Sequence, residues 1–502
     1  MSDQRRTASL GRVASAVGPL WTDGDGGRYA GRYPLAVERH AMAQIGHLLP
    51  GITTVTPHAR YYSLHAAVFA RAREKGLDDA STRRLLRRAE VLIGAVSIVH
   101  GQADPTAHAG MRSPHGSDHL APRVTSGADL DALSAEGAYA QAEWGFWGPY
   151  VASEFAMGLL ATEGKRTVDG PNTDRGALRN GFAGLFELAS QPFVSSDELS
   201  AAEHLCICGA RASADGHMLQ RVLVPKSSPA MHHDDRRAQT LRMLIRLTDL
   251  ASDAETRPLS QALAFGDARD DAVLRALAVF PAWTGVVLRT FMVAAWRNLW
   301  QYLVGSVEGF MAVEALGGVF ADTLPTGLVR EFVGSRPRGL DGARPLGGEF
   351  TSEVKALGVA EATLSHLVIG AGRSGRLDER TQAYFEGARA ERYQQLTPSW
   401  MHDRLTEWAD RPLRDFAVWL THQLVARAER IALMKASFDD STGRFRIPTR
   451  VFVRDGYVFK DSEEAGGGVA LRWDSAFEVM AGVGLVARAD GRWIVTDAGR
   501  AA

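Results

Sequence analysis

The sequence predicts a mainly α-helical protein of several packed domains, with winged-helix-like β-hairpins of which the clearest lies at the C-terminus. Three observations support this fold class. Long stretches repeat apolar residues at the three- and four-residue spacing of amphipathic helices. Gly and Pro residues divide these stretches at the expected helix ends. Alternating strand-like segments are short and surround tight turns such as Asp490-Gly491.

Length and composition are those of a globular protein with more than one core. The 502 residues are 45% hydrophobic and 23% charged, and a chain of this length is expected to form about two to four packed units. The net charge of -1 gives no overall attraction to nucleic acid or to an anionic membrane, so any such contact must come from a local patch.

Cysteine content and hydropathy favour a cytoplasmic location without a membrane span. The chain has 2 cysteines, in a C-x-C pattern that is poor for bridging, and no apolar signal-peptide core follows the first residues. The most apolar window, 303–321, contains Glu308, Glu314 and several glycines. It therefore predicts a buried helix pair.

Turn signals and composition divide the chain into four segments. We expect an N-terminal helical domain at 1–145, a winged-helix-like segment at 146–190, a central helical domain at 191–440 and a C-terminal winged helix-turn-helix domain at 441–502. Within the first domain, residues 1–34 are rich in Gly, Arg and Asp and predict an irregular arm.

The N-terminal domain is organised around a motif in residues 48–64. Pro50-Gly51 predicts a tight turn, and Pro57 predicts a helix start that continues to Gly76. We expect the loop to be buried, with Arg60 paired to a carboxylate or to helix-end carbonyls, because an unpaired buried arginine is too costly. The residues of this structural motif are Pro50, Gly51, Thr53, Thr54, Arg60 and Tyr61.

A helix is predicted from Asp78 to His100, with an arginine-rich face that is interpreted mainly as a solvated surface. The Gly/Pro-rich connector after it, up to Pro122, has the histidine density of some metal sites. Its spacings fit no common ligand pattern, which favours a long connector. The residues concerned are His100, His108, His115, His119, Asp104 and Asp118.

A second group of possible ligands consists of His204, Cys206, Cys208 and His217. Two thiols and two imidazoles are compatible with zinc. However, a C-x-C pair holds its sulfurs on different faces of a helix, and the neighbouring residues are apolar. We therefore expect buried cysteines that pack a small helix and bind no metal, and we expect no cofactor.

Two segments share the order helix, Gly-Leu, strand, turn, strand. The first covers 150–168 and the second covers 475–496. A helix that leads into such a hairpin is typical of the end of a winged helix-turn-helix module. The second copy is the more convincing, because Asp490-Gly491 between alternating strands is a strong hairpin signal.

The terminal unit carries the predicted nucleic-acid contacts. Arg488 and Arg492 flank the turn, and Arg472 precedes the helix, so these three are expected to contact phosphates. Asp490 at the tip, and Trp493 with Ile494 in the second strand, favour a hairpin that is partly covered by protein. Protein docking is thus the alternative role of this unit.

Local catalytic signatures are weak in this sequence. It contains no phosphate-binding loop, H-E-x-x-H, G-x-S-x-G or dinucleotide fingerprint. Glu353-Val354-Lys355 with Asp341 matches half of a nuclease pattern, and Ser352 with Lys355 matches S-x-x-K. Neither match follows a recognisable strand, so we do not assign catalytic residues.

The N-terminal motif also carries a family resemblance. Pro50-Gly51-Ile52-Thr53-Thr54 followed by Ala59-Arg60-Tyr61-Tyr62 resembles the P-G-x-[ST]-T…[AR]-R-Y motif of large uncharacterised helical proteins of bacteria and archaea. Arg87-Arg88-Ala89-Glu90, the following histidine and the Gly-Leu hairpin near Leu160 are similar to later landmarks of that group. The resemblance implies a setting in phage-defence gene neighbourhoods, beside helicases or nucleases, and it implies no catalytic residue.

The sequence therefore favours a cytoplasmic, non-enzymatic component of a bacterial anti-phage defence assembly. It would bind nucleic acid, dock partner subunits such as a helicase or nuclease, or do both through its winged-helix modules. The alternative from another class is a hydrolase, in particular a nuclease, with a site built from scattered His and Asp residues such as those of the connector at 100–119. A transcription regulator is a third possibility, although the winged unit is a small part of the chain.

Overall fold

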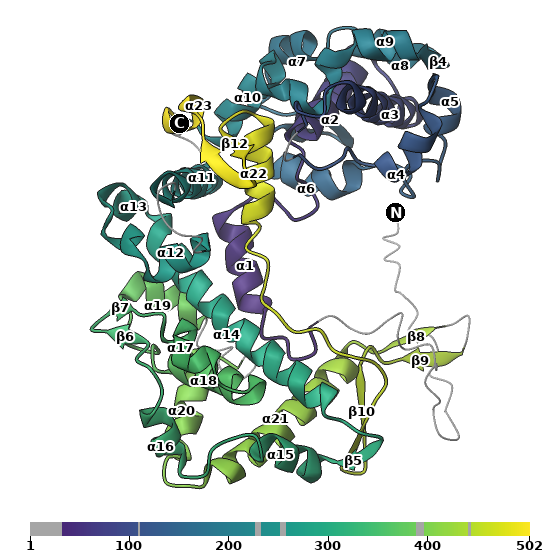
Figure 1. The fold of residues 1–502 in the computed structure, drawn as a ribbon. Helices are drawn as coiled ribbons and strands as arrows, with labels where there is room; N and C mark the ends of the chain where they lie inside the picture. Colours follow the sequence, from purple (N-terminus) through teal and green to yellow (C-terminus); the bar gives the residue numbers. More distant parts are fainter. Residues whose placement is uncertain (1–32, 109–110, 226–231, 252–257, 388–395, 440–442) are drawn as a thin grey trace, which may run out of the picture.

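The protein is mainly helical, which confirms the predicted fold class. The computed structural model describes residues 33–108, 111–225, 232–251, 258–387, 396–439 and 443–502. It is 59% helix and 10% strand, and the strands form small antiparallel sheets and hairpins. Figure 1 shows an upper lobe that contains both the early helices and the C-terminus, and a lower lobe built around one long helix. Nearly all of the expected N-terminal arm lies outside the described residues.

Two long helices form the centre of the upper lobe. They are α2 (Ala59–Lys75) and α3 (Asp79–Ala103). Helix α2 begins just after Pro57 and ends at Gly76, whose φ of 63° gives the left-handed C-cap for which glycine is suited. The Asp78 side chain then accepts a hydrogen bond from the Ser81 amide and caps α3. This local chemistry agrees with the helix limits that the sequence predicts.

Short elements surround this helix pair. In chain order they are α4 (Ser117–Leu120), β1 (Gly127–Asp129), α5 (Leu130–Leu133), α6 (Trp147–Ala156), β2 (Leu160–Glu163), β3 (Arg166–Asp169), α7 (Arg175–Gly181), α8 (Leu185–Ser190), β4 (Phe193–Ser195), α9 (Ser196–Ala201), η3 (Glu203–Leu205), η4 (Ile207–Arg211), α10 (Ala214–Leu223) and α11 (His232–Leu250). Strands β1 and β4 pair antiparallel across a long stretch of sequence, and β2 pairs with β3 as a hairpin.

The arginine face of α3 is less solvated than predicted. Arg87 is buried, and its guanidinium donates to the carbonyls of Ser134, Ala135 and Ala142. Arg88 is half-buried and reaches the carbonyl of Gln191. These arginines hold the irregular segments that cover α3 by donating to their backbone carbonyls. The helical pattern of the sequence alone does not predict these contacts.

The lower lobe surrounds α14 (Val279–Gly305), which carries the large buried side chains Trp283 and Trp296. The other elements of this lobe and of the joint are α12 (Leu259–Phe265), α13 (Ala272–Ala276), β5 (Phe310–Ala312), α15 (Val313–Ala321), α16 (Val329–Gly334), β6 (Leu340–Asp341), β7 (Arg344–Pro345), α17 (Ser352–Lys355), α18 (Val359–Ala371), α19 (Glu379–Glu386), α20 (Pro398–Glu407), α21 (Leu413–Met434), β8 (Ser437–Asp439), β9 (Arg444–Arg446), β10 (Val451–Arg454) and β11 (Tyr457–Lys460). Among the described residues, α14 alone is long and apolar enough to cross a membrane, and 83% of its most apolar window is buried inside the protein.

The last segment of the chain is divided between the lobes. Strands β10 and β11 form a hairpin whose second strand pairs with β5 of the lower lobe. The chain then returns to the upper lobe as α22 (Trp473–Gly482), β12 (Val486–Ala489), β13 (Arg492–Val495) and α23 (Asp497–Arg500). Residues 441–502, predicted as one domain, thus contribute to both lobes.

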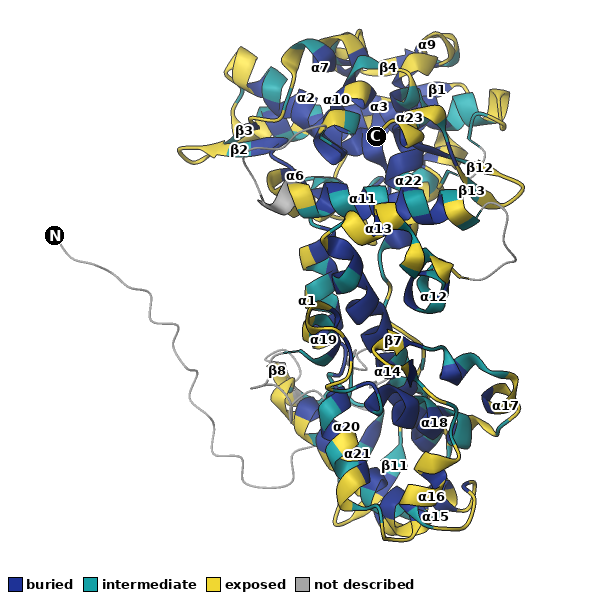
Figure 2. Ribbon diagram, turned by 90° about the vertical axis from the view of Figure 1, so that its left-hand side faces the viewer, coloured by how far each residue is buried: buried dark blue, intermediate teal, exposed yellow. Residues whose placement is uncertain are grey.

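Several of the described segments connect the lobes, as Figures 1 and 2 show. Among them are α1 (Arg39–Leu48), the upper end of α14 and the chain that leads to α22. The rings of Trp283 in α14 and Trp473 in α22 meet edge to face, with centroids 5.3 Å apart. Thr240 in α11 accepts a hydrogen bond from the Trp283 indole and donates one to the carbonyl of Leu48. The joint is therefore a packed continuation of the core.

Candidate nucleic-acid interface

The predicted terminal hairpin is present, with its two arginines at the surface. Ala489 pairs with Arg492, and the two turn residues between them have positive φ values, 50° at Asp490 and 76° at Gly491. Arg488 and Arg492 are exposed. The Arg488 guanidinium lies 5.4 Å from the centroid of the Trp493 ring. Both cations are accessible, although one already stacks on the hairpin.

The helix before this hairpin is not available to read a nucleic-acid groove. Eight of the 10 residues of α22 are buried, and the helix packs against α2, η4 and β12. Trp493 also stacks on Phe477 of α22, with ring centroids 5.5 Å apart. A recognition helix must present side chains to base edges. This unit therefore offers an exposed hairpin without an exposed recognition helix.

Arg472 belongs to the joint. It caps α22 with a φ of 63°, and its guanidinium donates to the carbonyl of Ile52 at 3.3 Å. The side chain is half-buried, and this burial lowers its pKa. Arg472 thus connects the C-terminal unit to the loop of the N-terminal motif. Its role is structural and differs from that of the exposed Arg488 and Arg492.

The first helix–hairpin unit is more open than the terminal one. Helix α6 has only three buried residues, Tyr150, Ser153 and Glu154. The β2–β3 hairpin projects from the lobe, as Figure 2 shows, and carries the exposed cations Lys165 in its turn and Arg166 at the start of β3. The first hairpin has the same four-pair register as the terminal one, although its sequence signal is weaker.

A cleft of about 300 Å³ lies between this hairpin and α2. Its aromatic wall consists of Phe69, Trp144 and Trp147, in which Trp147 lies 4.8 Å from Phe69 and 5.1 Å from Trp144 between ring centroids. The Trp147 indole also donates to the buried carboxylate of Glu154 at 3.0 Å, which holds the ring in place. Both tryptophans are half-exposed and can contact a ligand.

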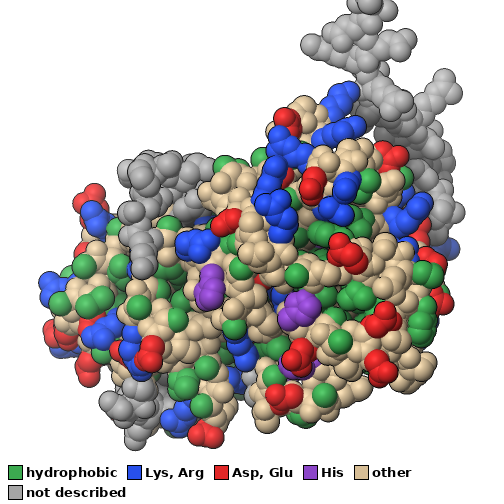
Figure 3. Space-filling view, turned by 90° about the horizontal axis from the view of Figure 1, so that it is seen from above, with side chains coloured by type: hydrophobic (Ala, Val, Ile, Leu, Met, Phe, Trp, Pro, Cys, Tyr) green, Lys and Arg blue, Asp and Glu red, His purple; other side chains and the backbone are tan. Residues whose placement is uncertain are grey.

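Charged side chains form the rim of the cleft. Arg73 is engaged with Glu163 at 2.8 Å and with Asp169 at 3.7 Å. The exposed cations at the tip, Lys165 and Arg166, also line the cleft. In Figure 3, which looks down on the upper lobe, Lys and Arg side chains gather along part of one edge. The cleft thus combines planar apolar surface with three cations and two carboxylates, those of Asp79 and Glu163.

The N-terminal motif has a structural placement. Arg60 and Tyr61 are buried, whereas Thr53 is half-buried and Thr54 is exposed, so the loop is less covered than expected. Arg60 donates to the carbonyls of Gly181, His204 and Cys206 and lies 3.5 Å from Asp215.

The turn of the motif is held by its own side chains. The Thr53 amide donates to the Thr56 hydroxyl at 3.0 Å, and the Tyr62 hydroxyl donates to the carbonyl of Gly51 at 2.9 Å. Gly51 has a φ of 81°, which explains the Pro50-Gly51 turn. Pro50 and Gly51 are themselves half-buried.

The histidine-rich connector and the C-x-C segment meet in space. His100 and His108 lie against Cys206 and Cys208, with all four donor atoms within 4.8 Å of one another. This arrangement argues against the expectation that these cysteines only pack a small helix. The spacing within each segment could not predict this arrangement, because the possible ligands come from separate segments. His204 and His217 are exposed and outside this cluster.

The other members of the connector have separate environments. His115 bonds to the Tyr150 hydroxyl at 3.0 Å, and its pKa falls to about 3 because it is buried beside His58 and His65. Asp104 accepts hydrogen bonds from the following turn, and His119 is exposed. Among the described residues, these side chains do not belong to the group of possible metal ligands formed by His100, His108, Cys206 and Cys208.

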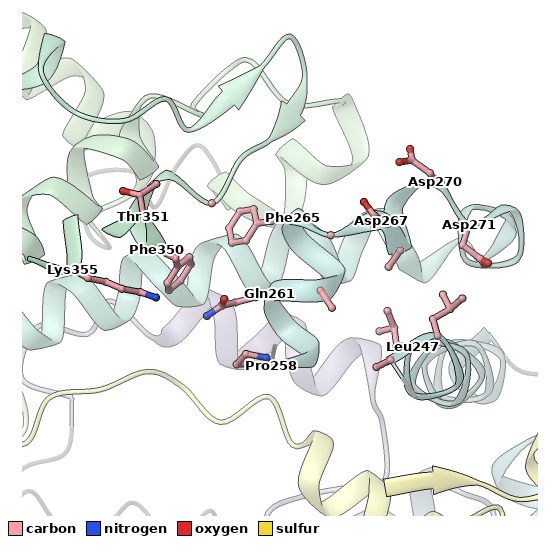
Figure 4. A pocket seen from close by; sticks show the side chains of 16 residues that line it. Leu247, Pro258, Gln261, Phe265, Asp267, Asp270, Asp271, Phe350, Thr351 and Lys355 are labelled. Carbon is pink, nitrogen blue, oxygen red and sulfur yellow. The ribbon is translucent and has the colours of Figure 1, made fainter. Parts of the chain in front are cut away.

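A second, larger cleft lies at the joint between the lobes, with a volume of about 1120 Å³. Figure 4 shows Phe265 and Gln261 at its centre, three carboxylates at one end and Lys355 at the other. Asp271 is paired with Arg246 at 2.7 Å, and Asp270 with Arg344 at 3.1 Å. Lys355 and Glu353 lie in the one-turn helix α17, where residues two apart point in different directions. The E-x-K match therefore has no strand to support it.

Comparisons with known proteins give no further assignment. No family model matches this chain, and no curated protein or solved structure matches it. The geometry described above is thus the basis for the functional proposals.

Proposed function

We propose that the protein is a non-enzymatic component that binds single-stranded nucleic acid in the cleft beside the β2–β3 hairpin. The observation that carries this proposal is the combination of Trp144 and Trp147 with the exposed cations Lys165 and Arg166 around one cleft. Aromatic rings accept nucleobases of any identity, and cations contact the backbone phosphates. The cleft has a volume of about 300 Å³, which suits a single nucleobase and is too small for a double helix.

The setting of this activity is part of the proposal. The resemblance of the N-terminal motif supports a cytoplasmic bacterial anti-phage defence assembly, in which a helicase or nuclease subunit would act on the strand that this chain holds. The nuclease alternative has weaker support. The convergent group of possible metal ligands contains two imidazoles, two thiols and no carboxylate, whereas two-metal nucleases use carboxylates.

The two hairpins supply a matched test of the binding site. We expect Lys165→Ala/Arg166→Ala to weaken binding of a labelled single-stranded oligonucleotide, measured by fluorescence anisotropy at two salt concentrations. Loss of two phosphate contacts should also reduce the salt slope, d log K/d log[salt], by about 1.4 in magnitude. Arg488→Ala/Arg492→Ala removes two cations from the β12–β13 hairpin, whose preceding helix α22 is buried. This variant should leave the oligonucleotide affinity and the salt slope unchanged.

If Arg488→Ala/Arg492→Ala weakened binding and Lys165→Ala/Arg166→Ala did not, the interface would lie at the terminal hairpin, where the sequence predicts it. Failure of the wild-type chain to bind DNA or RNA strands would contradict the proposal. Trp144→Ala gives an independent check, because loss of one stacking ring should cost about 1–3 kcal/mol in binding free energy. A duplex competitor should compete poorly, since stacking on Trp144 and Trp147 requires an unpaired base.

A second candidate function, docking of a protein subunit, is favoured by an aromatic row in the lower lobe. Phe452, Phe459 and Phe310 stand opposite one another on β10, β11 and β5. Their neighbouring ring centroids are 5.1 and 5.2 Å apart. Phe310 is 62% exposed on the end strand of the sheet. An apolar row at a sheet edge is a typical site for another chain.

Phe310→Ser should therefore remove a partner subunit from the purified assembly. The measurement is affinity purification of the tagged chain from its native host, with the recovered subunits quantified by mass spectrometry. Val359→Ser, which changes another exposed apolar residue at the start of α18, is the control. Equal recovery of every subunit with both variants would exclude the aromatic row as a docking site.

A further inference from the structure

Four possible metal ligands converge in the upper lobe. His100 lies in the last turn of α3, and His108 lies in the connector that follows. Cys206 and Cys208 lie at the junction of η3 and η4. These residues come from segments about 100 positions apart in the sequence, with separations of 98 for His108 to Cys206 and 108 for His100 to Cys208.

The donor atoms form a closed ring of contacts. His100 Nδ1 lies 3.3 Å from His108 Nε2, and His108 Nε2 lies 2.9 Å from Cys206 Sγ. Cys206 Sγ lies 3.2 Å from Cys208 Sγ, which lies 3.5 Å from His100 Nδ1. A tetrahedral zinc ion with ordinary Zn–N and Zn–S bonds separates its ligand atoms by about 3.3–3.8 Å. The four neighbouring separations are close to this range, and all of the donor atoms lie within 4.8 Å of one another, so the set reaches that geometry when the closest pairs move apart and the longer separations shorten.

We propose that His100, His108, Cys206 and Cys208 bind one zinc ion in a closed, tetrahedral structural site. Two thiolates and two neutral imidazoles are a standard zinc ligand set, and four protein ligands leave no open coordination position for catalysis. Binding displaces the two thiol protons to solvent, so the charge of the ion and the two thiolates sums to zero.

The surroundings of the cluster are built to hold these ligands. Arg60 donates to the backbone carbonyls of His204 and Cys206, and the Ile207 amide donates to Ser97 Oγ at 3.0 Å. Gly101 provides space for the His108 ring, because a Cβ there would lie 2.9 Å from His108 Nδ1. Backbone hydrogen bonds around metal ligands fix their orientation and are a regular part of zinc sites.

The proposed ion would join three parts of the fold. It links the end of α3 and the connector to the η3–η4 segment, on which Arg60 of the N-terminal motif also acts. Arg211, at the end of η4, donates to the carbonyls of Ala107 and Ala481 and so extends this connection to α22. The proposal is independent of nucleic-acid binding, since the cluster shares no residue with the cleft beside β2–β3.

The competing explanation is a metal-free cluster of thiol–imidazole hydrogen bonds. The full chain, produced without a polyhistidine tag in zinc-supplemented medium, should contain about one zinc per chain by elemental mass spectrometry. Cys208→Ser and His108→Ala should each lower this ratio severalfold. His119→Ala, which removes an exposed histidine from the same connector, should leave the ratio unchanged.

Cobalt substitution tests the ligand set without any variant. Metal-free wild-type chain titrated with Co²⁺ should develop the visible absorption of a tetrahedral site together with a thiolate-to-cobalt charge-transfer band, saturating at one equivalent. Zinc added afterwards should abolish both. Strongly substoichiometric zinc in the wild type, or a cobalt spectrum without the thiolate band, would overturn the proposal. A zinc ratio that is equal in the wild type, Cys208→Ser and His108→Ala would overturn it as well.

Discussion

Arg60→Met is expected to lower the free energy of unfolding of the upper lobe by about 3–5 kcal/mol. The guanidinium is buried and donates to three carbonyls on two segments, those of Gly181 at the end of α7 and of His204 and Cys206 in and directly after η3. It also lies 3.5 Å from the buried carboxylate of Asp215. Methionine fills much of the same space but leaves these acceptors without their donor and the carboxylate without its cation.

Chemical denaturation followed by circular dichroism measures this loss. Arg179→Met is the matched control, because Arg179 is exposed on α7 and its replacement should change stability by no more than about 0.5 kcal/mol. Arg60→Lys should recover only part of the loss, since an ammonium group cannot reproduce the planar set of donors. Equal stability of Arg60→Met and Arg179→Met would show that the motif has a role other than holding the lobe together.

Features controlled by neighbouring residues were predictable from the sequence. The Pro50-Gly51 turn, the helix start after Pro57 and the end at Gly76 follow from backbone preferences that act within a few residues. The Asp490-Gly491 hairpin belongs to the same class, because positive φ at both turn positions is a local requirement. A buried arginine needs hydrogen-bond acceptors, and this requirement correctly predicted that Arg60 pairs with carbonyls and a carboxylate.

Features created by distant segments were not predictable. The cluster of possible metal ligands joins His100 and His108 to cysteines about 100 residues away, so no local spacing pattern predicts it. The burial of α22 depends on α2 and η4, although its own sequence is compatible with a recognition helix. Arg472 was assigned to nucleic acid from its position before that helix, while its actual carbonyl partner, Ile52, is 420 residues away.

The buried polar network around His65 was also absent from the sequence-based prediction. His65 Nδ1 lies 2.6 Å from Glu154 Oε1, and Nε2 lies 3.0 Å from Glu90 Oε1. Glu90 additionally accepts a hydrogen bond from the Tyr139 hydroxyl at 2.6 Å, and Glu154 accepts one from the Trp147 indole. A histidine between two carboxylates, on helices α2, α3 and α6, is positioned to be a buried imidazolium.

This network predicts that stability decreases as the pH rises above neutrality. Burial by itself lowers the pKa of His65, but the charge of Glu154 and the hydrogen bonds of both carboxylates outweigh it and raise the pKa from 6.5 to about 9. The folded state therefore binds the proton more tightly than the unfolded chain does. The stabilisation is fully present below pH 6.5 and is lost as the pH rises through about 9, amounting to roughly 3 kcal/mol.

A second buried histidine, His58, has a pKa shift in the opposite direction. Burial lowers the pKa of His58 from 6.5 to about 4, so this residue is neutral in the folded protein near neutral pH. Its contribution is present above pH 6.5 and is lost as the pH falls toward 4. His65 therefore contributes to the loss of stability on the alkaline side, and His58 contributes to the loss on the acid side.

Urea unfolding of wild type and His65→Gln, at pH values of about 6.5 and 9.5, isolates the alkaline side. The wild type should lose roughly 3 kcal/mol between these values. The variant should be less stable than wild type at the lower pH and nearly independent of pH across the interval. His422→Gln should keep the wild-type dependence, because His422 is exposed and pairs with the exposed Glu314. A wild-type stability that does not change over this interval would mean that His65 is neutral in the folded protein and that one of its two carboxylates holds the proton.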